Sequence, residues 1–588
     1  MARPLFEQRR ASSEHTNDRG LAEEDALLTG EHTQKYEPPH SKWQKIREVG
    51  LFVWALLATT IVIILAVVVQ KERTTAAPTP LPDGKRNLIF MVSDGMGPTS
   101  LSLTRSFKQY EHAEPWDNTL ILDGHLIGQS RTRSSSSLVT DSAAGATAFS
   151  CGHKSYNGAI SMLPDHQPCG TVLEAAKKAG YMTGLVVTTR ITDATPACFA
   201  AHVNMRSEED RIAEQMVGDY PLGRVVDLML GGGRCHFLPN STEGSCRDDD
   251  RDIVAYAKEQ GFDYVDSRNG FDGLKMGDAV KLPLLGLFAG TDIPYEIDRR
   301  NEADIYPSLD EMARTAMKAL SDATRDSDKG FFLMIEGSRI DHAGHANDPA
   351  AQVHEVLAYD KAFASVLGFL ERDDTQGVMV STSDHETGGL ATARQLHSTY
   401  PEYLWYPGVL SNTSHSAERI SLNYNKFLSG QPKKPAIEAW VRKNLKKGLG
   451  IEDADDSEVK SLVNNPALAP YTFADMVSRR SQIGWSTHGH SAADVNIFAS
   501  SPKAAAPLVG NHENTEVGDF LRNYLDVDVE AVTKELQAKG TSFVNALGQA
   551  VNWMGEVPSH DDEHGWEDHL DHYQHDFKRH KRCDICGV

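Results

Sequence analysis

The chain has 588 residues, 40% of them hydrophobic and only 26 of them proline, which excludes a small disulfide scaffold, a disordered tail and a collagen-like fibre. Its 82 acidic residues outnumber 59 basic ones, for a net charge of −23. Because a protein that wraps nucleic acid needs a basic surface to displace counterions, this balance argues against nucleic acid binding.

The first predicted element is a membrane anchor. Leu51 to Val69 is a run of nineteen residues without a charge. As an α-helix it would be about 28 Å long, close to the thickness of the hydrocarbon core of a bilayer. A long polar segment, residues 1–50, precedes it and no small-residue cleavage site follows, so the pattern favours a single-pass transmembrane helix over a cleaved signal peptide.

Sequence features on the two sides of this run indicate its orientation. Both glycosylation sequons, Asn240-Ser-Thr and Asn412-Thr-Ser, follow it. The tail before it contains Glu23, Leu27 and Leu28, in a pattern that resembles the acidic dileucine signals read by cytosolic sorting adaptors. We therefore expect a type II protein of the vacuolar, lysosome-like membrane, with a cytosolic tail over 1–50, a stalk over 70–84 and the rest of the chain in the lumen.

An oxidising lumen would allow disulfides. Two pairs are possible, Cys235 with Cys246 and Cys151 with Cys169, whereas Cys198 resembles a buried thiol and the terminal pair Cys583 and Cys586 is a lone CxxC. The sequence leaves this connectivity open.

After the stalk, apolar runs of strand length alternate with helical segments. The expected strands cover residues 87–93, 181–189, 225–232, 331–337 and 377–383, and two of the expected helices cover 171–180 and 308–321. This alternation predicts an α/β domain over 85–555 with a central, mostly parallel sheet between helices. Residues 397–480 are polar and are interpreted as an insertion. Residues 556–588 contain six histidines and are interpreted as a disordered tail, or one that is removed or sequesters metal.

Polar residues follow the expected strands where parallel strands should end together. Asp94 follows the first run, Glu336, Asp341 and His345 follow the fourth, Asp384 and His385 follow the fifth, and His488 lies in a later Ser-Thr-His-Gly-His segment. Each alone is typical of a helix cap or a solvated turn. Together they predict a site for two or three metal ions, because His with Asp suits zinc and oxygen ligands alone suit magnesium.

Ser142, in the segment VTDSAAGATA, precedes a helix of small residues. Its hydroxyl would lie at the positive end of that helix, where anions bind, although a simple cap would occupy the same position. Since no Gly-x-Ser-x-Gly elbow surrounds it, we expect metal activation of this serine rather than a catalytic triad.

Six motifs in this order, VSDGMG, VTDSAAGATA, TDATPACFAAHVNMR, IEGSRIDHAGH, STSDHETGG and STHGH, resemble the alkaline phosphatase family over about residues 85–550. The tail, the anchor and the dileucine pattern resemble its fungal vacuolar members. The resemblance implies a homodimer that hydrolyses small phosphate monoesters through a phosphoserine at alkaline pH, with two zinc ions and one magnesium ion per subunit and a crown region over 397–480.

The resemblance also implies a role for each residue. Ser142 would be the nucleophile and Arg206 would bind the phosphate, with Asp141 orienting that arginine. Asp341, His345 and His488 would hold the first zinc, Asp384, His385 and Asp94 the second, and Asp94, Thr195 and Glu336 the magnesium. Near the third ion, Asp193 and His342 form a mixed pair where the family shows Asp with Lys or two histidines, which leaves the identity of that ion open.

Three other functions fit the sequence less well. A sulfatase needs a C/S-x-P-x-R context, which is absent around Ser142. A phosphodiesterase usually carries a threonine nucleophile and lacks the segment that supplies Arg206. A catalytically dead membrane protein for metal storage or adhesion would have lost a ligand or the nucleophile, and none is missing.

Overall fold

The computed structural model describes residues 42–74 and 84–558, and the chain divides into two units, Met1–Ala77 and Pro78–Val588. The predicted sorting signal at Glu23, Leu27 and Leu28, the CxxC of Cys583 and Cys586 and residues 559–588 lie outside the described part. In the first unit, helix α2 (Lys42–Thr74) includes the whole uncharged run. Within the described residues, no helix combines the length and the apolar character needed to cross a membrane.

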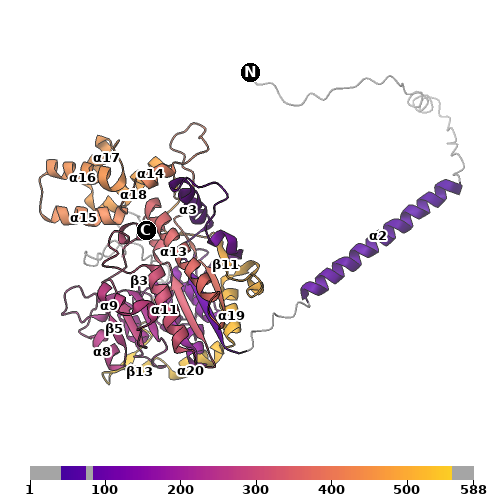
Figure 1. The fold of residues 1–588 in the computed structure, drawn as a ribbon, viewed down its shortest axis with the longest axis horizontal. Coiled ribbons are helices and arrows are strands. Elements are labelled where there is room, and N and C mark those ends of the chain that lie inside the picture. Colours follow the sequence, from indigo (N-terminus) through magenta and orange to yellow (C-terminus); the bar gives the residue numbers. More distant parts are fainter. Residues whose placement is uncertain (1–41, 75–83, 559–588) are drawn as a thin grey trace, which may run out of the picture. The chain divides into compact units, whose positions relative to one another are not determined.

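The second unit is built on a ten-stranded sheet, with the order β12-β2-β11-β8-β1-β7-β3-β4-β6-β5 (Figure 1). Its strands are β1 (Arg86–Val92), β2 (Leu126–Arg131), β3 (Met182–Arg190), β4 (Leu228–Gly232), β5 (Asp263–Val265), β6 (Leu284–Leu287), β7 (Phe331–Glu336), β8 (Gln376–Thr382), β11 (Val495–Ala499) and β12 (Gly510–Glu513). Neighbouring strands are parallel except that β11 is antiparallel to both β2 and β8. The prediction of a mostly parallel α/β sheet is confirmed.

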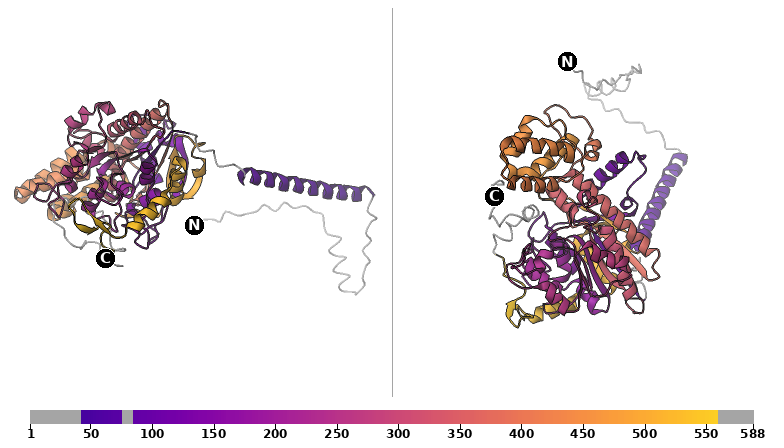
Figure 2. Two further views of the ribbon diagram at one scale, coloured as in Figure 1. Left: turned by 90° about the horizontal axis from the view of Figure 1, so that it is seen from below. Right: turned by 60° about the vertical axis from the view of Figure 1, so that its left-hand side comes forward.

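Helices cover both faces of this sheet (Figures 1 and 2). Leu88, Phe90 and Val92 of β1 pack into one apolar cluster with α4 (Ser142–Cys151), α5 (Val172–Lys178), α6 (Ala194–Ala200), α19 (Asn514–Leu525) and α20 (Val529–Lys539). Ile89 and Met91 point the other way, into a cluster with α11 (Leu309–Ala323) and α13 (Pro349–Leu370). Burying each such side chain stabilises the fold by about 1.5–3 kcal/mol, which is why strands apolar on both faces form the centre of the sheet.

The insertion is helical. Residues 397–480 contribute α14 (Pro407–Ser411), α15 (Ala417–Ser429), α16 (Lys434–Leu449), α17 (Asp456–Asn464) and α18 (Ala469–Ser481, which ends one residue beyond the predicted boundary). Fully buried Tyr424, Leu445 and Phe473 belong to an apolar cluster shared with α3 (Pro98–Glu111) and α13. The insertion therefore packs as a helical group at one end of the sheet unit, coloured orange in Figure 1.

The shorter elements complete the unit. They are α7 (Glu209–Met216), α8 (Ile253–Glu259), α9 (Arg268–Gly273), α10 (Glu296–Arg299), α12 (Arg339–His345), the two-residue pair β9 (Glu386–Thr387) and β10 (His490–Ser491), and the hairpin β13 (Ser542–Val544) and β14 (Ala550–Asn552).

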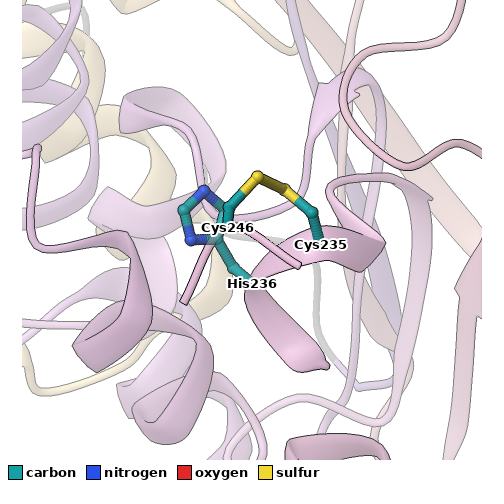
Figure 3. A group of neighbouring side chains, drawn as sticks. All are labelled: Cys235, His236 and Cys246. Carbon is teal, nitrogen blue, oxygen red and sulfur yellow. A yellow bond between two sulfur atoms is a disulfide. The ribbon is translucent and has the colours of Figure 1, made fainter. Parts of the chain in front are cut away.

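Both possible disulfides form, Cys151 with Cys169 and Cys235 with Cys246, and Cys198 is a buried thiol. His236 lies beside the second disulfide (Figure 3). Cys235, His236 and Cys246 together have the side-chain types of a metal site. Because the two sulfur atoms are bonded to each other, they are not available as thiolate ligands for a metal ion.

Candidate active site

Three carboxylates lie together because of the sheet register. Val92, the last residue of β1, pairs with Glu336 of β7 on one side and with Thr382 of β8 on the other. Asp94 and Asp384 follow β1 and β8 by two residues each. All three carboxylates are at most 6% exposed, so the carboxyl ends of three neighbouring parallel strands bring three buried acids to one edge of the sheet.

Asp94, Asp384 and His385 form the first candidate metal group. One ligand atom from each lies within 4.8 Å of the others. Nε2 of His385 is 3.2 Å from Oδ2 of Asp384 and 3.5 Å from Oδ1 of Asp94. The Ser142 hydroxyl lies 3.0 Å from the same Nε2. The serine therefore faces the group directly.

The second group forms around α12. Asp341 and His345 lie one turn apart on this helix, and Nε2 of His345 is 3.3 Å from Oδ2 of Asp341. The third member is His490, whose Nε2 is 3.0 Å from Nε2 of His345 and 3.6 Å from Oδ1 of Asp341. The hydroxyl of Thr387 donates to Asp341 and holds its carboxylate in place.

His488, expected as a zinc ligand, is not brought into this group. It is exposed, its ring packs edge-on against Tyr471, and its Nδ1 is 2.7 Å from the carbonyl oxygen of His345. His490 is positioned in its place because β10 pairs with β9 directly after His385. Two histidines separated by one residue are equivalent in a strand pattern, so the sequence alone did not distinguish them.

The third group lies around Glu336. One of its carboxylate oxygens accepts a hydrogen bond of 2.7 Å from the Ser338 hydroxyl. The other, Oε1, has no hydrogen-bond partner among the described residues, and the same holds for the buried oxygens Oγ1 of Thr195, Oδ1 of Asp94 and Oδ2 of Asp384. Buried oxygens are normally satisfied, so four such atoms at one edge fit the binding of cations.

Electrostatics support that interpretation. Burial, together with the charges of Asp384 and Asp341, raises the pKa of Asp94 well above its usual value. Burial raises the pKa of Glu336 to about 8. Burial alone would also raise the pKa of Asp341, but His345 and His490 hold it well below its usual value. A buried set of like charges needs positive counter-charge, which bound cations would supply.

Arg206 contacts two carboxylates, and one of them, Asp141, directly precedes Ser142 in the chain. Its Nη2 donates a 2.8 Å hydrogen bond to Oδ1 of Asp193, and its Nη1 is 3.6 Å from Oδ2 of Asp141. Asp141 is the N-cap of α4, and its Oδ1 accepts from the amide of Ala144. The residue that caps the Ser142 helix thus also contacts the guanidinium.

The sequence analysis missed the residues behind Asp193. Arg190, 2% exposed, pairs with Glu209 at 2.9 Å and with Asp292 at 3.1 Å, and its Nη2 is 3.6 Å from Asp193. Glu209 in turn is 3.3 Å from His236, which follows the disulfide cysteine Cys235 (Figure 3). Arg190 ends a buried strand, and no motif set it apart from an ordinary capping residue.

Carboxylates and imidazoles gathered beside a serine and a guanidinium are suited to phosphate esters, and the fold and the site together define a metal-dependent hydrolase of that class. The alkaline phosphatase family model matches residues 85–527. The chain belongs to the alkaline phosphatase family, and it hydrolyses phosphate monoesters.

Relatives agree with this assignment. The repressible alkaline phosphatase of Saccharomyces cerevisiae is 54% identical over 486 residues, which cover 79% of this chain and 85% of the relative. The cold-active alkaline phosphatase of the psychrophile Shewanella sp. is similar in structure, with a TM-score of 0.62 and 30% identity over 75% of this chain and 99% of that one. A mutant alkaline phosphatase from the Antarctic bacterium TAB5, with Mg bound in the M3 site, has a TM-score of 0.51. It is 28% identical over 75% of this chain and 98% of that one.

Proposed function

We propose that this enzyme transfers the phosphoryl group of a monoester to Ser142 and then to water, with two zinc ions and one magnesium ion in the three groups. The observation that carries the proposal is the 3.0 Å contact between the Ser142 hydroxyl and Nε2 of His385. The same nitrogen lies 3.2 Å from Oδ2 of Asp384 and 3.5 Å from Oδ1 of Asp94, two buried oxygens that accept no hydrogen bond. When bound, the cations would neutralise the phosphate charge, lower the pKa of the Ser142 hydroxyl and stabilise the leaving oxygen.

The residues divide among the ions by chemistry. Asp341, His345 and His490 offer the mixed imidazole and carboxylate set that zinc prefers, and so do Asp384, His385 and Asp94. Thr195 and Glu336, with Asp94 between the groups, offer oxygen atoms, which suit magnesium.

Protein groups carry the binding steps. The guanidinium of Arg206 can donate two hydrogen bonds to two phosphate oxygens, and its ion pairs with Asp193 and with Asp141, the residue before Ser142, fix its position. The N-terminus of the ten-residue helix α4 favours negative charge next to Ser142. As the serine oxygen attacks phosphorus, its proton passes to solvent and the bond to the substrate alcohol breaks. The leaving oxygen takes up a proton from water, and the Ser142 phosphoester is formed. Water then cleaves the phosphoester, which releases phosphate and restores the serine.

The test is to trap the phosphoenzyme. Labelled phosphate mixed with metal-loaded enzyme and quenched in acid should leave label on the wild type and none on Ser142→Ala. Ser150→Ala, a change of the same type at the other end of α4, should label and turn over normally. Normal turnover by Ser142→Ala would remove the serine from the mechanism.

The choice of magnesium for the third ion rests on the orientation of His342. Nε of Arg339 donates to Nδ1 of His342 at 3.2 Å. The proton of a neutral ring is then on Nε2, which is 3.9 Å from Asp193 and cannot offer a lone pair to zinc. His342 would therefore donate to Asp193 or to a water molecule of a hydrated ion.

Reconstitution of stripped enzyme tests this choice. Zinc alone should restore only part of the rate, added magnesium should complete it, and excess zinc should inhibit. Equilibrium dialysis should find one magnesium and two zinc ions per chain. Full activity with three bound zinc ions and no response to magnesium would contradict the assignment.

The topology is also a proposal. The uncharged run 51–69 in α2 would anchor a homodimer in the vacuolar membrane, with Glu23, Leu27 and Leu28 read by a cytosolic adaptor and glycans on Asn240 and Asn412. In support, Leu51, Phe52 and Trp54 are each at least 60% exposed, and both asparagines are exposed. Alkaline extraction of membranes should leave the enzyme in the pellet, and replacing Leu27 and Leu28 by alanine should relocate it without loss of activity.

A further inference from the structure

Helix α12, which carries Asp341 and His345, is too short to fix its own position. It has seven residues, and its N-cap Ser338 makes no side-chain hydrogen bond to the first turn. The Ser338 hydroxyl donates to Glu336 instead. A helix of about two turns is not stable by itself in water. Contacts with other segments must therefore determine where its side chains point.

The first residue of α12, Arg339, is held by the insertion. Arg339 is 2% exposed. At about 100° of rotation per residue, it lies on the side of the helix opposite to Asp341 and His345. Its Nη2 donates to Oε2 of Glu418 at 2.6 Å, and its Nη1 donates to Oε1 of the same carboxylate at 3.3 Å. Glu418 lies in the first turn of α15 (Figure 1), so an insertion residue grips the back of the helix that carries two candidate zinc ligands.

Three further contacts fix the guanidinium of Arg339. Its Nη1 also donates to the carbonyl oxygen of Ile293 at 3.0 Å, and its Nε donates to Nδ1 of His342 at 3.2 Å. Its Cζ lies 3.7 Å from the centre of the Tyr295 ring. The guanidinium is planar and its donors have a fixed geometry, so it cannot turn without losing several of these contacts at once. A shift of Glu418 would therefore be passed on to α12.

The beginning of α15, from which Glu418 projects, is itself anchored to the sheet unit. Oδ2 of Asp348 accepts from the amide of Ala417 at 2.7 Å. Nδ1 of His415 lies 2.8 Å from Oδ1 of Asp298. Both carboxylates are at most 3% exposed. Because hydrogen bonds to buried charged groups are strong, Glu418 comes from a fixed helix end.

We propose that Glu418 is a positioning residue for zinc binding: through Arg339 it holds α12 in the rotation that brings Asp341 and His345 to His490. The proposal rests on the function proposed above, which assigns zinc to those three residues. An ion pair that only attached the insertion would change the stability of the enzyme without changing its affinity for zinc. That difference is what the experiment measures.

The test measures zinc binding to the full-length enzyme in zinc buffers with magnesium in excess, beside the unfolding temperature of the metal-free protein. Glu418→Gln keeps the shape of the side chain and removes its charge. One zinc ion per chain should then bind about tenfold to a hundredfold more weakly, as is usual when a group that orients a ligand is lost. Glu302→Gln is the matched control, because Glu302 accepts two hydrogen bonds, of 2.8 and 2.6 Å, from Arg419 of the same helix. It should bind zinc as the wild type does, whatever its effect on the unfolding temperature.

Arg339→Lys is the second variant, for the case that Glu418→Gln does not fold. A lysine keeps the charge but cannot hold Glu418 and His342 together, so it should weaken the same zinc ion to a similar extent. Wild-type zinc affinity in either folded variant would overturn the positioning role and leave the phosphoserine mechanism intact. Equal weakening in Glu302→Gln would assign the effect to the insertion as a whole and would also overturn it. A wild type that binds no zinc would contradict the proposed function itself, and this inference with it.

Discussion

The rings of His385 and His490 are stacked, with centroids 3.5 Å apart and an angle of 18° between their planes. Two imidazolium ions would repel each other strongly at this separation, so both rings cannot be protonated. Burial, and next the charge of His385, lower the pKa of His490 well below its usual value. A neutral imidazole is the form that binds zinc, so the stacking favours the form of His490 that the proposed zinc site requires.

The two histidines of the Ser-Thr-His-Gly-His segment should therefore differ in their effect on bound metal. His490→Ala should lose close to one zinc per chain and reduce kcat by about a hundredfold, in line with the loss of a ligand. His488→Ala should keep its full metal content, because its ring lies against Tyr471 outside the group. Atomic emission analysis of both variants after dialysis checks this, and loss of zinc from His488→Ala alone would restore the assignment made from sequence.

Arg206 should act mainly on phosphate binding. Arg206→Ala removes a fork that can hold two phosphate oxygens, and we expect KM for substrate and Ki for inorganic phosphate to rise together by about tenfold to a hundredfold. Arg206→Lys keeps the charge without the two-pronged guanidinium, so its KM and Ki should lie between those of the wild type and of Arg206→Ala. The control is Arg211→Ala, at an arginine that pairs with Glu208 at 2.9 Å instead of with Asp193 or Asp141. If turnover fell at unchanged Ki, the arginine would have a different role.

Arg190 should be a structural support for the phosphate site. Arg190→Ala leaves the carboxylates of Glu209 and Asp292 buried without their partner, which should destabilise the enzyme by about 3–5 kcal/mol. Arg190→Lys should be milder. Because Arg190 also lies beside Asp193, which holds Arg206, the lysine variant should bind inorganic phosphate more weakly. Thermal unfolding and phosphate inhibition measure the two effects, and Arg325→Ala, at an arginine with a 72% exposed side chain, should change neither.

Glu355 should make stability depend on pH. Burial raises the pKa of this carboxyl to about 7 from an ordinary value of 4.5, despite nearby Arg339 and Arg299, and its Oε1 accepts from the amide of Glu296. Between about pH 4.5 and pH 7 the folded enzyme therefore holds a proton that the unfolded chain releases. The free energy of unfolding falls as pH rises through this range. Glu355→Gln keeps the acceptor and should become more stable than the wild type by up to about 3 kcal/mol near pH 8.

The measurement is the pH dependence of the unfolding temperature for both proteins. At pH 4 to 5 the two should be nearly equal, and the difference should open toward pH 8. Glu371→Gln, at an exposed glutamate directly after the same helix, should follow the wild type throughout. Parallel curves for Glu355→Gln and wild type would show that Glu355 is ionised in the fold.

The sequence predicted the sheet and the carboxylates well because both depend on simple patterns. Strands β1, β3, β4, β7 and β8 are apolar on both faces, and their ends carry Asp94, Glu336 and Asp384 directly. The residues that it missed act through contacts between distant segments. Arg190 and Asp292 meet across 102 residues of chain, and His490 reaches the site through a two-residue pairing with Glu386 and Thr387. No local periodicity records such contacts.

The position of β1 in the sheet has a consequence for biosynthesis. Leu88 pairs with Phe332 on one side and with Val378 on the other. The first strand of the sheet to be translated therefore cannot pair until residues about 250 and 290 positions downstream have been synthesised. The last segment of the candidate metal site, at His490, comes roughly 400 residues after Asp94, which at about 5–20 residues per second takes about 20 to 80 seconds of translation. A chain that stops before the His490 segment contains the acidic strand ends but not the complete candidate site. Metal binding can therefore stabilise the domain only after its topology is in place.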